Sequence, residues 1–193
     1  MTKRQPLAYR AVPASSGAKV LQVRSVELAM VHNVRTFVRS SLVDPDAPEM
    51  REVEKAGYEM IVFDSPPSLG LTTTNILLAA TEVVVPVATT YLSLDGCAEM
   101  SETVRKVAEK DNTALHISLV VPTLYRKTAL ADEVLERLQR YFPGKVARQP
   151  LAFNVAIDEA QSHGKTIWEY APWSRGATLL QSVAEDVDRA TRS

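Results

Sequence analysis

The chain has 193 residues, enough for one domain, and 46% of them are hydrophobic, as in an ordinary folded protein. Its 22 basic and 23 acidic residues give a net charge of −1, which excludes a histone-like polycation. The single cysteine, Cys97, excludes a disulfide framework and any zinc or iron–sulfur site built from several cysteines. With no run of 18 apolar residues and no secretory signal pattern, we expect a cytoplasmic protein without membrane contact.

The beginning of the chain differs in charge from the rest. Its first 40 residues hold seven Lys or Arg and one Glu, a local charge of +6. Residues 1–17 include Pro6 and Gly17 and show no apolar periodicity, so they predict a flexible basic arm ahead of one domain over 18–193. Such charge is typical of a solvated tail; the alternative is an arm that touches nucleic acid or acidic lipid.

Apolar patterns beyond the arm predict alternating strands and helices. Continuous apolar runs suit parallel strands buried on both faces, and they predict strands over 19–24, 59–63, 83–87, 115–121 and from Val146. Helical spacing and capping residues predict helices over 26–40, 70–80, 94–110, after Thr128 and from about Ser174. The inward residues expected on the last two helices are Leu130, Val134, Leu135, Leu138 and Phe142, then Leu179, Leu180, Val183 and Val187. This alternation predicts an α/β domain with a parallel sheet.

An acid follows the apolar run 59–63. Ligands of parallel α/β sheets gather at the carboxyl ends of the strands, and Asp64 occupies such an end. A carboxylate there can hold Mg²⁺ through water beside the phosphates of a nucleotide, although an acid before a proline is also common as a turn cap. Pro66 and Pro67 stiffen the backbone directly after it, which suits a loop that responds to a ligand as well as a plain turn.

Residues 58–71, YEMIVFDSPPSLGL, resemble the Walker B region of the ParA family of partition ATPases, part of the deviant Walker A group that includes MinD. Further segments resemble the family in the same order, over about 18–190: 81–87, 91–96, 154–165 and 169–177. The resemblance implies a parallel-sheet fold like that of P-loop NTPases, truncated at its N-terminus.

The family's glycine-rich phosphate loop has no counterpart in this sequence. Only two glycines, Gly144 and Gly164, precede a lysine, and the residues five positions earlier are Gln139 and Glu159. We therefore expect an open apolar edge on the strand 59–63, weak or absent ATP binding, and an incomplete domain over 18–193. Re-pairing of the sheet, a strand supplied by a partner, and a late start or a split gene are the alternatives.

The resemblance implies roles for individual residues. Asp64, Pro66 and Pro67 would lie at the nucleotide and its Mg²⁺, with the metal held by Asp64 through water. Asn154 would contact the adenine base, although Asn is also a common helix N-cap, and the family often has Pro-Arg where this chain has Ala152-Phe153. No catalytic residue is assigned. For any single basic residue, ordinary surface charge is a simpler explanation than DNA contact. The candidates for nonspecific DNA contact are Arg126, Lys127, Lys145, Arg148, Lys165 and Arg175.

By resemblance, the chain acts in plasmid or chromosome partition or in cargo positioning. ATP and Mg²⁺ would be the cofactors. The implied partners are a second copy, a full-length ParA-type protein, a ParB-like DNA-bound protein and nonspecific DNA at the nucleoid. The alternatives are a non-enzymatic module that docks on a full-length ParA-type protein, a fragment of a split ATPase, and a non-functional remnant. Acids in the last helix disfavour the membrane-binding MinD branch.

Overall fold

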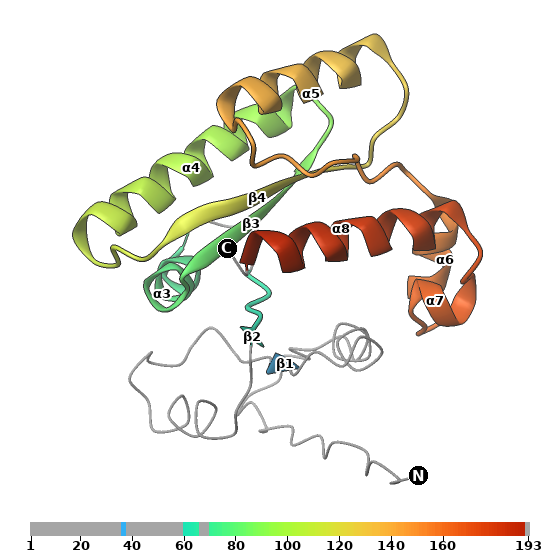
Figure 1. Ribbon diagram of the computed structural model, residues 1–193, viewed down its shortest axis with the longest axis horizontal. Helices are drawn as coiled ribbons and strands as arrows, with labels where there is room; N and C mark the ends of the chain where they lie inside the picture. Colours follow the sequence, from blue (N-terminus) through green and yellow to red (C-terminus); the bar gives the residue numbers. More distant parts are fainter. Residues whose placement is uncertain (1–35, 38–59, 66–69, 192–193) are drawn as a thin grey trace, which may run out of the picture.

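The computed structural model describes residues 36–37, 60–65 and 70–191. Strands and helices alternate along the first part of this range, and helices alone follow (Figure 1). The elements are β1 (Thr36–Phe37), β2 (Met60–Ile61), α3 (Leu71–Ala79), β3 (Glu82–Ala88), α4 (Leu92–Lys110), β4 (His116–Thr123), α5 (Ala129–Tyr141), α6 (Val155–Ser162), α7 (Ile167–Tyr170) and α8 (Arg175–Thr191). The predicted α/β class with parallel strands is confirmed.

The parallel pair β3–β4 forms the centre of the described structure. Its register runs from Glu82 opposite His116 to Ala88 opposite Thr123. Along the other edge of β4, residues 145–153 run parallel to it, with the backbone N–H of Val120 donating to Lys145 O at 2.7 Å. The strand predicted from Val146 is thus present as an extended segment that pairs through isolated bridges.

The side chains of β4 alternate between two apolar layers, and a β-bulge shifts this alternation by one residue. The register shifts after Val83, so that Ser118 is the extra residue of β4. Ile117 before the bulge packs on the side of α4 and α5, and Leu119 after it packs on the side of α8. Figure 1 shows α4 and α5 on one side of the strand pair and α8 on the other. Both faces of the strands are therefore covered, which explains their continuous apolar sequence.

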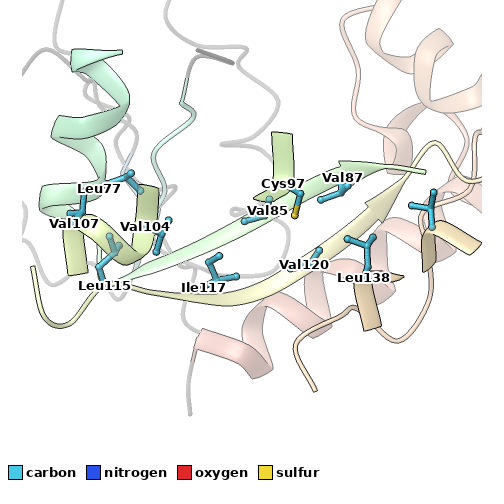
Figure 2. Close-up of a cluster of buried hydrophobic side chains, with 11 residues drawn as sticks. Leu77, Val85, Val87, Cys97, Val104, Val107, Leu115, Ile117, Val120 and Leu138 are labelled. Atoms are coloured by element: carbon cyan, nitrogen blue, oxygen red, sulfur yellow. The ribbon is translucent and has the colours of Figure 1, made fainter. Parts of the chain in front are cut away.

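The larger core lies between the strand pair and the helices α3, α4 and α5 (Figure 2). Val120 and Leu138, at 0% and 1% exposure, are among its most buried members. The inward stripe of α5 consists of Ala131, Val134 and Leu138. Leu130, predicted to point inward, is 48% exposed, because the stripe begins one residue later and turns it to the flank.

Two further predictions differ from the structure near its beginning. Phe37 falls in the predicted helix 26–40 but belongs to the strand β1, which pairs in parallel with β2. Its aromatic ring and the β-branched Thr36 favour a strand once a neighbouring strand is available. The strand predicted over 59–63 is limited to Met60–Ile61, and one of its edges is occupied by β1. The arm 1–17, the strand 19–24 and the pair Pro66 and Pro67 lie outside the described residues.

Across the described residues, no helix has both the length and the apolar character that crossing a membrane requires.

Candidate nucleotide and nucleic-acid site

Several candidate residues come within a few residues after the carboxyl ends of parallel strands. Asp64 comes three residues after β2 and is exposed. Arg126 and Lys127 come after β4, and Asn154 follows the extended segment that runs beside β4. The carboxyl ends of parallel strands face the same edge of a sheet, so the fold directs the loop after β4 and the loop after the extended segment to one edge. The strand β2, which precedes Asp64, pairs with β1 in a separate sheet, so the structure does not bring Asp64 together with these loops. The exposed carboxylate of Asp64 has the donor chemistry that Mg²⁺ accepts.

Asn154 is the N-cap of α6. Its Oδ1 accepts a hydrogen bond from the backbone N–H of Ala156 at 3.0 Å, which confirms the N-cap interpretation. Within the described part of the chain, its Nδ2 has no hydrogen-bond partner, so the amide retains donors for a ligand. The adenine contact stays a prediction.

The sequence analysis did not single out Gly176, although it fixes the place of Asn154. A Cβ on Gly176 would lie 3.0 Å from both Cγ and Oδ1 of Asn154. The first turn of α8 can therefore approach the cap of α6 this closely because residue 176 has no side chain. The signal was present in the segment 174–177, whose small residues resemble the family's pattern before the last helix.

The loop between β4 and α5 is held in place at several points. Leu124 has a φ of 52°, and the backbone of Tyr125 pairs on both sides with residues of the extended segment. Thr128 begins α5 as its N-cap, accepting from the N–H of Ala131 at 3.2 Å, as predicted. The basic pair Arg126 and Lys127 therefore projects from a fixed backbone.

A carboxylate on α5 binds two side chains of this loop. Asp132 accepts hydrogen bonds from Lys127 Nζ and from Tyr125 Oη, both at 2.7 Å. The hydrogen bonds from Lys127 and then Tyr125 lower the pKa of Asp132 below its ordinary value. The same contacts with Asp132 raise the pKa values of Lys127 and Tyr125. Asp132, which no sequence motif indicated, completes a charged cluster at the edge where Asn154 also lies.

Arg126 stacks on an aromatic ring. Its guanidinium carbon lies 4.4 Å from the ring centroid of Phe153, the residue before Asn154. A cation–π contact of this kind orients the guanidinium without neutralising it. The ParA family often has an arginine at the position of Phe153. The sequence therefore showed that this chain differs from the family here, but it did not indicate that Phe153 contacts Arg126.

The other predicted DNA contacts are dispersed. Lys145 Nζ donates to Ile117 O at 2.8 Å, near the amino end of β4. Arg148, in the extended segment, contacts the C-terminal part of α8, where it donates to the buried Asp186 and to Glu185. Both line a groove of about 380 Å³ that also includes Arg189. Lys165 and Arg175 are exposed, and Arg175 begins α8 beside Gly176. The structure thus brings together Arg126 and Lys127 and leaves Lys145 and Arg148 at the far end of β4.

Comparisons with known proteins connect this arrangement with partition proteins. A family model described as "AAA domain" matches residues 17–117. The sporulation initiation inhibitor protein Soj of Bacillus subtilis is 37% identical over 168 residues, which are 86% of this chain and 64% of that protein. The chromosome-partitioning ATPase Soj of Treponema pallidum is 38% identical, over 69% of this chain and 53% of that protein. The chain therefore spans between half and two thirds of the length of these relatives.

Among solved structures, the septum site-determining protein MinD of Pyrococcus horikoshii has a TM-score of 0.60. It is 20% identical, and the match covers 77% of this chain and 58% of that one. The likeness supports the predicted fold of the deviant Walker A group.

Proposed function

We propose that this chain, which belongs to the ParA family, acts in chromosome or plasmid partition or in the positioning of a cellular cargo. The observation that carries the proposal is the 37% identity to a Soj protein over 86% of the chain. A second relative is named a chromosome-partitioning ATPase. The fold is consistent with the same function, because it brings Arg126 and Asn154 to neighbouring loops at the carboxyl end of β4.

The nucleotide contacts of this chain would come from the Mg²⁺ and base side of an ATP site. Asp64 would hold Mg²⁺ through water, and the Nδ2 donors of Asn154 would face the adenine. When bound, Mg²⁺ neutralises charge on the phosphates. Pro66 and Pro67 would shape the loop after Asp64. These 193 residues contain no glycine-rich loop to cradle the phosphates, so by themselves they would not hydrolyse ATP.

Nonspecific DNA is the second proposed ligand. Arg126 and Lys127 project from one fixed loop, and Lys165 and Arg175 are exposed, with Arg175 next to Gly176, which lies against Asn154. Phosphate contacts require only cations on one face, and we propose Arg126 and Lys127 as the first of them. Lys145 and Arg148 are engaged elsewhere, with a backbone carbonyl and with two carboxylates. The proposed protein partners are a second copy, a full-length ParA-type protein and a ParB-like protein bound to DNA.

Binding to a labelled DNA duplex of random sequence tests this proposal. We expect binding at low salt that weakens as salt rises, and Arg126→Ala should reduce the affinity about three- to tenfold and the salt slope by about one. Arg140→Ala removes the same charge from the exposed far end of α5 and serves as the matched control, with an effect below about twofold. Absence of salt-dependent binding, or equal effects of both substitutions, would contradict the proposed DNA contact.

A second candidate function is a non-enzymatic module that docks on a full-length ParA-type protein. Large apolar side chains are exposed at the starts of α3 and α4 and between α7 and α8: Leu71 at 85%, Leu92 at 82% and Trp173 at 96%. Exposed apolar groups rimmed by polar residues are a common feature of protein interfaces. Co-elution of the chain with a complete ParA-type protein from the same source would favour this candidate.

A further inference from the structure

The two neighbouring cations of the β4–α5 loop have different surroundings. Lys127 Nζ lies 2.7 Å from Oδ2 of Asp132, and its side chain is otherwise 81% exposed. Arg126 instead lies over the ring of Phe153, 4.4 Å from its centroid. An aromatic face carries no charge, so the Arg126 guanidinium keeps its full charge and its in-plane N–H groups. The carboxylate cancels most of the local field of Lys127.

Asp132 is fixed more firmly than the lysine that it binds. It lies in the first turn of α5, where the helix dipole favours an anion. Its second oxygen accepts from Tyr125 Oη at 2.7 Å, and the backbone of Tyr125 is paired to the segment beside β4. Lys127 reaches this carboxylate with a long, exposed side chain. A phosphate that approaches Lys127 must therefore displace Asp132 as the partner of the ammonium group.

We infer that Asp132 competes with nucleic-acid phosphates for Lys127, so that Asp132 lowers the affinity of this loop for DNA and Arg126 is its leading phosphate contact. The inference rests on the proposed DNA binding and identifies Asp132 as a residue of the same chain that limits the affinity for DNA. An exposed ion pair contributes little to stability, so the carboxylate can exchange for a phosphate at small cost. Asp132 therefore sets the strength of binding without abolishing it.

The test compares Asp132→Asn with the unchanged chain in the same random-duplex assay. Asparagine keeps an acceptor for Tyr125 Oη but releases Lys127, which then contributes one more phosphate contact. We expect an affinity gain of about three- to tenfold and a salt slope larger by about one. Glu136→Gln, one turn further along α5, makes the same charge change at another exposed site and should gain less than about twofold.

A double-mutant cycle separates the contact from the general charge effect. In the Lys127→Ala background, Asp132→Asn should gain less than about twofold, because no ammonium group is left to release. Tyr125→Phe removes a hydrogen bond without altering charge and should leave the affinity within about twofold. Circular dichroism of each variant checks that the fold is retained.

The outcomes distinguish this inference from the proposed function. A gain with Asp132→Asn that disappears in the Lys127→Ala background supports the inference. Binding that is equal for Asp132→Asn and Glu136→Gln, or a gain that persists without Lys127, overturns it and leaves the DNA proposal standing. If no variant binds the duplex, the proposed DNA contact and the inference both fail.

Discussion

The Leu138→Ala variant is expected to lose about 3 kcal/mol of unfolding free energy. Leu138 is 1% exposed and belongs to the core shared by α5, α4 and the two central strands (Figure 2). Truncation leaves a cavity next to Val120, which is fully buried and has little room to move. The measurement is urea denaturation followed by far-ultraviolet circular dichroism.

The matched control for this prediction lies on the same helix. Leu130→Ala makes the same chemical change at a side chain that is 48% exposed. It should lower the unfolding free energy by less than about 1 kcal/mol, because most of the removed surface is already in water. Equal losses for the two variants would contradict the inward stripe of Ala131, Val134 and Leu138.

The second large effect is expected at a buried carboxylate on α8. Asp186 is 4% exposed and accepts hydrogen bonds from the backbone N–H of Arg148, at 2.9 Å, and from Arg148 Nε. It also forms an ion pair with Arg189 at 3.3 Å. Asp186→Asn replaces one of its two acceptor oxygens by a donor that faces other donors. We expect a loss of about 2 kcal/mol of unfolding free energy, the order of a hydrogen bond to a charged group.

Glu185→Gln is the control, because Glu185 precedes Asp186 and binds the same arginine at 3.2 Å but is exposed. Removal of the ion pair between Glu185 and Arg148 should leave the urea midpoint nearly unchanged, as for most surface ion pairs. The hydrogen bonds from Arg148 to Asp186 connect α8 to the extended segment beside β4. If the two substitutions destabilise the protein equally, this connection does not stabilise the fold as we expect.

The parts of the fold that depend on residues close together in the sequence were predictable from the sequence. Thr128 as an N-cap and the start of α8 after Ser174 follow from local capping chemistry, and both are confirmed. The continuous apolar runs predicted β3 and β4 because both faces of these strands are covered. Asp64 was expected at a strand end because an acid that ends an apolar run marks the carboxyl end of a strand, but β2 ends three residues earlier, at Ile61.

Contacts between residues far apart in the sequence could not be predicted. Arg126 and Phe153 are 27 residues apart, and Arg148 and Asp186 are 38 apart. No periodic pattern encodes such a pair, because it depends on how two loops or helices pack. The same holds for β1, since Thr36 and Phe37 fit a helical pattern and form a strand only beside β2. Asp132 was missed because an acid in a first helical turn is ordinary without knowledge of its partners.

Calorimetric titration of Mg²⁺–ATP into the purified chain tests most directly the claim that a ParA-type site needs a phosphate loop. The elution volume of the chain is recorded first, and the Treponema pallidum relative, named a partitioning ATPase, provides the positive control. We predict saturable binding by the control and none by these 193 residues, which contain no glycine-rich loop. Saturable micromolar binding by this chain, weakened by Asp64→Ala or Asn154→Ala, would contradict the account and assign a nucleotide contact to the substituted residue.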